Sequence, residues 1–80
     1  MSVPILAPDL GTDRGNVSLW FVKPGERLHE GDRIVELQIS GATIDLIAPA
    51  TGTMGERFVL QSDHVTAGQI LGVIHTDPDQ

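Results

Sequence analysis

The amino-acid sequence predicts an all-β domain, a sandwich or barrel of short strands. Nine Gly and five Pro divide the 80 residues into segments that are too short for ordinary helices. The intervening segments are rich in Val, Ile, Leu, Phe and Thr, which favour strands. A chain of this length, 40% hydrophobic, can build one modest core, so we expect a single domain without an enclosed substrate cavity.

The expected strands are, in chain order, Val3–Leu6, Val17–Val22, Arg33–Ile39, Ala42–Ile47, Thr53–Val59 and Ile70–His75. Within the third segment, Val35, Leu37 and Ile39 alternate with polar residues, so one face should pack while the other faces water. Trp20 is expected to pack as a buried or half-buried aromatic side chain.

Turn residues separate these segments. Pro24–Gly25, Gly31–Asp32 and Ser40–Gly41 suit tight reversals, and residues 49–52, Pro-Ala-Thr-Gly, suit a corner. Gly25 and Gly52 are therefore interpreted as turn residues. Gly41 tolerates a positive φ without strain, which is what the tip of a hairpin requires.

The two halves of the chain repeat at an offset of 37 residues. Val22, Glu26, Leu28 and Gly31 correspond to Val59, Asp63, Val65 and Gly68. Each copy then continues into an apolar strand, from Ile34 in one half and from Leu71 in the other. Two repeats are too few for a solenoid, so we expect a closed sandwich with approximate two-fold symmetry, in which each half covers the other's apolar face.

Charge and composition exclude several classes of function. Eleven acidic against five basic residues give a formal charge of -6, which repels nucleic-acid phosphates and anionic membranes. No Cys is present to form a disulfide or a thiolate metal site. No apolar run approaches the ~20 residues of a membrane span, and the first residues lack the basic segment of a secretory leader. We expect a cytoplasmic protein with protein partners, and neither nucleic acid nor a membrane.

Several residues carry groups that occur in catalytic or metal sites. Ser62, Asp63 and His64 hold the groups of a hydrolase triad, but neighbours in one turn usually point apart, and no nucleophile elbow is present. His29, His64 and His75 lack the i, i+4 spacing that would place two ligands on a helix face. No catalytic residue and no metal ligand is therefore predicted, and the protein is not expected to be an enzyme.

Three segments in order resemble lipoyl domains, of the biotinyl/lipoyl attachment family. Residues 20–32, WFVKPGERLHEGD, resemble the stretch before the modified hairpin, residues 42–54, ATIDLIAPATGTM, the stretch after it, and residues 65–74, VTAGQILGVI, the closing strand. The resemblance covers about residues 3–76 of a single domain, 1–80, and leaves 77–80 as a tail or the start of a linker. It implies a barrel-sandwich hybrid of two four-stranded antiparallel sheets, with the termini opposite an exposed hairpin whose lysine carries lipoate or biotin.

The resemblance breaks at that hairpin. The family's Glu-x-Asp-Lys-Ala segment reads Gln-Ile-Ser-Gly-Ala over residues 38–42, so Gly41 stands where the acceptor lysine belongs and only Ala42 is kept. Amide linkage of lipoate or biotin needs a side-chain amine, which glycine lacks, so no cofactor is expected. Gln38 and Ser40 also replace the carboxylates beside the lysine, where a modifying ligase reads the hairpin. The only lysine of the chain, Lys23, lies in a turn.

Two further observations concern the choice between biotin and lipoate and the origin of the change. Biotin attachment would ask for methionines beside the lysine, whereas Met54 lies well past the hairpin. The combined changes at Gln38, Ser40 and Gly41 favour a natural sequence that has left the acceptor role over a single engineered change.

Two functions follow from the resemblance. The first is a non-modified lipoyl-like domain that serves as a binding or structural module. The second is an inactive or altered copy of the acyl carrier domain of a 2-oxo acid dehydrogenase-type complex, in which a tethered group visits several active sites at high effective concentration. Both imply protein partners, among them components of a multienzyme complex.

Overall fold

The computed structural model describes residues 1–11 and 15–77, which form eight strands and no helix. The strands are β1 Ser2–Leu6, β2 Gly15–Trp20, β3 Arg27–Leu28, β4 Arg33–Ile39, β5 Ala42–Ile47, β6 Gly52–Arg57, β7 His64–Val65 and β8 Ile70–Thr76. They build two four-stranded sheets with strand orders β1-β8-β6-β3 and β5-β4-β2-β7. All pairings are antiparallel, so the predicted fold class is confirmed. The described part of the chain holds no helix that could cross a membrane.

The longer strands lie within two residues of their predicted bounds, but β3 and β7 were not predicted. Each has only two residues, too few to show an alternating pattern. β2 lies at Gly15–Trp20 rather than Val17–Val22, although the N–H of Phe21 still donates to the carbonyl of Ile34. The chain after Phe21 leaves the sheet because Lys23 already begins the next turn.

The predicted internal two-fold symmetry is confirmed by hydrogen bonds that repeat at the same offset. The N–H of Lys23 donates to Glu26 Oε1 at 2.9 Å, and that of Leu60 donates to Asp63 Oδ2 at 2.8 Å. The pairs β2/β6, β3/β7 and β4/β8 are each 37 residues apart. Moreover β4 and β8 share one order of buried and exposed residues.

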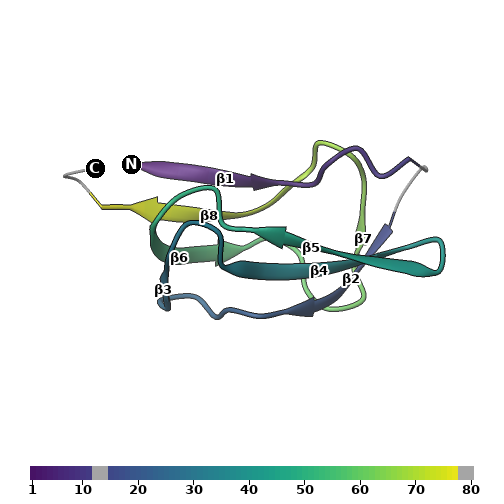
Figure 1. Cartoon of the computed structure of the whole chain (residues 1–80), viewed down its shortest axis with the longest axis horizontal. Helices are drawn as coiled ribbons and strands as arrows, with labels where there is room; N and C mark the ends of the chain where they lie inside the picture. The colour runs from purple at the N-terminus through teal and green to yellow at the C-terminus, as the bar shows by residue number, and fades with distance from the viewer. Residues whose placement is uncertain (12–14, 78–80) are drawn as a thin grey trace.

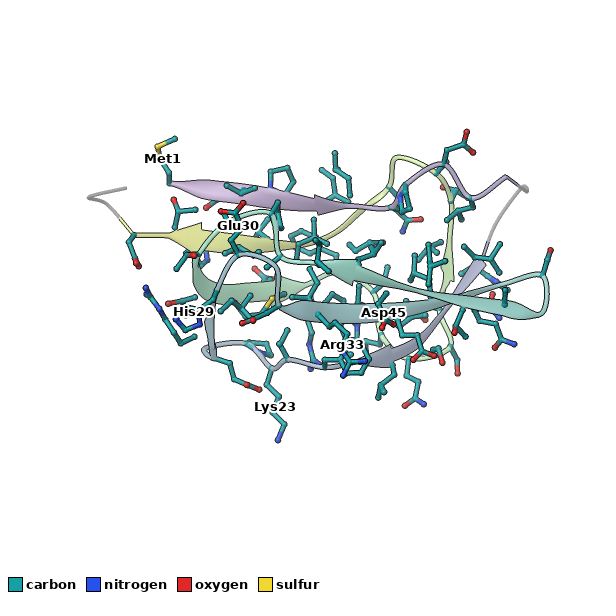
Figure 2. The ribbon with its side chains drawn as sticks, viewed as in Figure 1. Met1, Lys23, His29, Glu30, Arg33 and Asp45 are labelled. Carbon is teal, nitrogen blue, oxygen red and sulfur yellow. The ribbon has the colours of Figure 1, made fainter. Side chains whose placement is uncertain are left out.

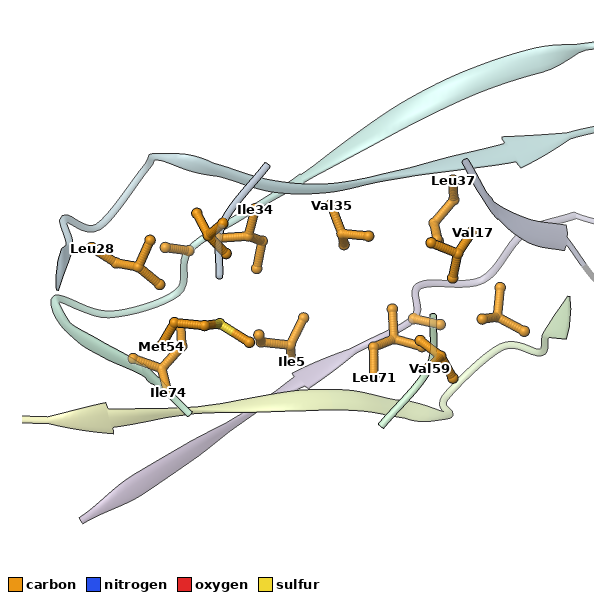
Figure 3. Close-up of a cluster of buried hydrophobic side chains, with 14 of the residues drawn as sticks. Ile5, Val17, Leu28, Ile34, Val35, Leu37, Met54, Val59, Leu71 and Ile74 are labelled. Carbon is orange, nitrogen blue, oxygen red and sulfur yellow. The ribbon is translucent and has the colours of Figure 1, made fainter. Parts of the chain in front are cut away.

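The core lies between the two sheets, and every buried side chain among the described residues is apolar. Figure 3 shows these side chains in two facing rows, with Val35 and Leu37 of β4 opposite residues of β6 and β8 such as Met54 and Leu71. Ile39, predicted on the same face, is only half-buried beside them. A register shift between Arg33 and Val35 also turns Ile34 inward. Each fully buried Leu or Ile contributes about 1.5–3 kcal/mol.

The prediction that Gly52 is a turn residue is wrong. Gly52 is the first residue of β6, and a Cβ there would collide with the carbonyl oxygen of His75. Gly15, its equivalent in the first half, would place a Cβ 2.8 Å from the carbonyl oxygen of Gln38. Close approach of neighbouring strands therefore explains both glycines. Gly25, by contrast, has a φ of 92° and is a turn residue as predicted.

The chain start and the end of β8 lie together at one end of an elongated body of 40 × 19 × 19 Å. The carbonyl of Met1 accepts hydrogen bonds from the backbone N–H and the hydroxyl of Thr76, at 2.8 and 3.2 Å. The β4–β5 hairpin projects at the opposite end (Figure 1), as the resemblance implied. The molecule thus presents its hairpin far from the chain start.

Candidate functional site

The tip of the β4–β5 hairpin is a two-residue loop. Ile39 faces Ala42 in the ladder, which leaves Ser40 and Gly41 as the connection. Their φ angles are 44° and 82°. Two consecutive positive values match a type I′ turn, whose twist suits the flanking strands, and Gly is favoured at its second position. The predicted turn is therefore confirmed.

The tip is open to solvent. Ser40, Gly41 and Ala42 are all exposed, and a Cβ built on Gly41 would meet no heavy atom within 4 Å. A longer side chain at this position would extend into free space. Gly41 itself offers no amine, and its local role is to adopt the positive φ that the turn needs.

Neutral polar residues form a row across the sheet at the base of the hairpin. Thr43, Gln38, Asn16 and His64 are successive partners across β5, β4, β2 and β7. The Nδ1 atom of His64 lies 2.9 Å from Asn16 Oδ1. Among the described residues, this row of four holds neither a carboxylate nor a Lys or Arg.

Lys23 lies in the turn between β2 and β3, and the structure does not bring it to the hairpin. Its carbonyl accepts from the N–H of Glu26 at 3.1 Å, while its own N–H donates to the Glu26 carboxylate. Its exposed side chain points away from the long side of the molecule (Figure 2). Lys23 and Gly41 therefore belong to separate surfaces.

The residues considered for a hydrolase triad do not converge. Asp63 accepts from the backbone N–H of Leu60, whereas the His64 ring contacts Asn16. Ser62 has a φ of 76° and its N–H donates to the carbonyl of Val17, so it serves the turn. The Asp63 carboxylate and the His64 ring thus have different partners.

The histidines are also separate. His29 Nδ1 lies 3.8 Å from Asp32 Oδ2 in the turn before β4, and His75 Nδ1 lies 3.0 Å from Ser2 Oγ on the other sheet. Within residues 1–11 and 15–77, no group of three metal-ligating side chains comes together. Nothing in this arrangement favours a metal site.

An apolar groove of about 410 Å³ lies between the edge strands β1 and β5, a feature that sequence reasoning missed. Its lining includes Leu6 and Ile47, both exposed, and Asp45, which pairs with Arg33 at 3.4 Å. The groove can be recognised only once the sheet order is known, because the two strands lie far apart in the chain.

Solved structures of known proteins share this architecture. The lipoyl domain of the 2-oxoglutarate dehydrogenase complex from Azotobacter vinelandii superposes with a TM-score of 0.73, at 24% identity, over 94% of this chain and 95% of that one. A single-chain, multi-domain long-chain acyl-CoA carboxylase gives a TM-score of 0.79 at 21% identity, over 98% of this chain and 8% of its own. The fold is that of the lipoyl-domain class.

Sequence comparison reaches the same class. Residues 3–74 match the Biotin_lipoyl family, described as biotin-requiring enzyme, and the chain belongs to this family. The dihydrolipoyllysine-residue succinyltransferase component of the Bacillus subtilis 2-oxoglutarate dehydrogenase complex is 28% identical over 74 residues, 92% of this chain and 17% of the relative. The acetyltransferase component of the Staphylococcus aureus pyruvate dehydrogenase complex is 27% identical over 89% of this chain. The chain spans about a fifth of the length of such relatives.

Proposed function

We propose that this chain is a non-modified lipoyl/biotinyl-like domain, a binding or structural module whose hairpin carries neither lipoate nor biotin. The observation that supports it is the Ser40–Gly41 tip. The tip is exposed enough to present a side chain, yet its second residue has none. A backbone amide nitrogen is not nucleophilic, so no amide bond to a carboxylic acid cofactor forms there.

The flanks of the tip support the same proposal. Gln38 and Ser40 are neutral, and the polar row at the hairpin base carries no carboxylate. The hairpin's carboxylates, Glu36 and Asp45, lie further from the tip than this row, so an enzyme that recognises acidic residues beside the lysine would not find them there. The domain would then act through its surface alone.

A second candidate is an altered copy of an acyl carrier domain within a 2-oxo acid dehydrogenase-type complex. The names of the relatives favour it, because both the succinyltransferase and the acetyltransferase are components of such complexes. In that setting the domain keeps the docking surface of a carrier without the transferred group. Protein partners belong to both proposals, as does the cytoplasmic location expected from the lack of a membrane-spanning or leader-like segment.

Intact-mass measurement after coexpression with a lipoate ligase, and separately with a biotin ligase, tests the proposal. We expect the unmodified mass in both cases, while a lipoyl domain and a biotinyl domain that keep their acceptor lysines, each coexpressed with its own ligase, show that the ligases are active. An increase by one lipoyl or biotinyl group contradicts the proposal. The Lys23→Arg variant then decides where the group is attached, because Lys23 is the one side-chain amine of the chain.

A further inference from the structure

The internal two-fold symmetry is broken at one place on the surface. Phe21 and Phe58 are equivalent: their N–H groups donate to the carbonyls of Ile34 and Leu71, at 2.9 and 2.8 Å. Both residues follow the outer end of an equivalent strand, β2 or β6. The surroundings of the two rings can therefore be compared position by position.

In the first half, a cation covers the ring and a second one follows it in the chain. The guanidinium of Arg33 stacks over Phe21, 4.6 Å from the ring centroid. Lys23 follows two residues after Phe21 and is exposed. A cation over an aromatic face and a charged neighbour make this surface water-compatible.

In the second half, apolar residues take both charged positions. Leu60 is equivalent to Lys23 and Ile70 to Arg33. Phe58, Leu60 and Ile70 are 53%, 57% and 48% exposed. The Phe58–Leu71 hydrogen bond holds the first of them beside the start of β8, so we refer to these three residues as the Phe58 patch.

The Phe58 patch lies on the half of the molecule that carries the hairpin. Val59 and Leu71, the chain neighbours of its members, point into the core near Val17 and Leu37 (Figure 3). Phe58, Leu60 and Ile70 stay exposed on the outside of the same region. Exposed apolar side chains that gather in one region of a surface are typical of an interaction site.

The rim of the patch is acidic. Asp63 accepts from the N–H of Leu60 at 2.8 Å, and exposed Glu56 precedes Phe58 by two residues. Arg57, next to Phe58 in the chain, is occupied by other partners: its guanidinium lies 5.6 Å from the ring of Trp20 and donates to the carbonyl of Val22 at 3.4 Å. The surface therefore offers apolar contacts bordered by carboxylates.

We propose that the Phe58 patch docks a basic amphipathic segment of a partner protein, with apolar side chains on the patch and Lys or Arg side chains at the acidic rim. The proposal rests on the binding-module function and specifies its partner. A second copy of the chain does not fit, because three side chains fall far short of the roughly 800 Å² per partner of a standard interface. Two chains of net charge -6 also repel each other.

Two peptides and two variants test this docking. The probes are a synthetic Leu/Lys amphipathic peptide of about 18 residues and its Leu/Glu counterpart. The test variant, Leu60→Gln with Ile70→Gln, removes apolar surface from the patch and keeps the charge of the protein. The control, Leu6→Gln with Ile47→Gln, removes two equally exposed apolar side chains from the β1–β5 groove. Amide chemical shifts and their titration report the binding.

We expect the Leu/Lys peptide to shift the amides of residues 56–63 and 70–72, and the Leu/Glu peptide to leave them unchanged. Affinity should fall about tenfold in the patch variant and change less than about twofold in the control. Equal affinity in both variants, shifts centred on the groove, or shifts spread over all carboxylates overturn the proposal. A dimer that the patch variant dissociates, detected by sedimentation, overturns the choice of occupant.

This experiment and the mass measurement fail independently. The variants leave residues 38–42 unchanged, so a modified hairpin would refute the proposed non-modified state without touching the docking result. An unmodified domain with an inert patch would refute only the docking.

Discussion

Arg27 and Asp77 join β3 to the residue that follows β8 through two parallel hydrogen bonds, of 2.7 and 2.5 Å. The hydrogen bonds from Arg27 hold the pKa of the Asp77 carboxyl below its usual range, and the carboxylate raises the pKa of the guanidinium. Both side chains remain partly exposed, at 51% and 30%, so water screens the pair. The contact connects elements 50 residues apart, at the end of the molecule where the chain starts.

A pH dependence of stability follows from this pair. Because the pKa of Asp77 is lower in the folded than in the unfolded chain, its stabilisation is fully present above about pH 4 and is lost as the pH falls through the folded pKa. Asp77→Asn should therefore lower the melting temperature slightly at pH 7 and not at all in strong acid. Melting curves across pH measure this. In an Arg27→Gln background the same change should have no effect at any pH, and an undiminished effect there would contradict the pairing.

Restoring a lysine at the tip tests how the hairpin lost its modification. Gly41→Lys alone should be lipoylated poorly by a lipoate ligase, because Gln38 and Ser40 leave the enzyme without acidic residues to bind. The triple variant Gln38→Glu, Ser40→Asp, Gly41→Lys should be lipoylated well. Intact mass after coexpression gives the modified fraction. Efficient modification of the single variant would refute this account of the hairpin.

Two glycine substitutions separate backbone conformation from close approach. Gly41→Ala meets open space but must keep a φ of 82°, which costs about 1–2 kcal/mol. Gly52→Ala has no such strain but drives its Cβ into the His75 carbonyl oxygen, which should cost about 2–3 kcal/mol or prevent folding. Urea unfolding monitored by Trp20 fluorescence compares them. Gly41→Asn should be more stable than Gly41→Ala, because Asn tolerates a positive φ. Gly52→Asn should be no more stable than Gly52→Ala.

Because the two halves are symmetric, truncating equivalent core side chains should lower the free energy of unfolding by similar amounts. Leu37 of β4 and Ile74 of β8 are equivalent and fully buried. Leu37→Ala and Ile74→Ala should each lower the free energy of unfolding by about 2–5 kcal/mol. Because domains of this size are stable by only about 5–10 kcal/mol, the double variant should be unfolded. Urea titration measures both, and a cost below about 1 kcal/mol at either site would show that its cavity collapses.

Local chemistry allowed much of the fold to be predicted. The hairpin turn at Ser40–Gly41 depends on two adjacent residues, and the repeat depends on apolar and turn residues that recur in both halves. The pairing of Arg27 with Asp77 and the collision at Gly52 depend instead on the register of strands that are distant in the chain. No single segment of sequence carries that information.

The candidate functional surfaces likewise include one that the sequence predicted and one that it did not. The exposed, side-chain-free tip was predictable, because Gly41 lies between two segments of strong strand character. The Phe58 patch was not, because the exposure of Phe58 becomes informative only when Phe21 and its Arg33 are seen to be equivalent. Symmetry made the comparison possible, and the alignment of the repeats alone did not show which side chains face water.

The symmetry that relates β4 to β8 also relates the hairpin tip to the chain ends. Ser40 follows β4 as Asp77 follows β8, and each is next to the start of an edge strand, β5 or β1. The chain therefore connects β4 to β5 through the hairpin tip at one end of the barrel, whereas the equivalent strands β8 and β1 at the other end are not joined. A circular permutant, cut between Ser40 and Gly41 and joined from Asp77 to Ser2 by a short linker, would keep every strand pairing. Its chain ends would lie at the former hairpin tip, and its new hairpin would connect β8 to β1.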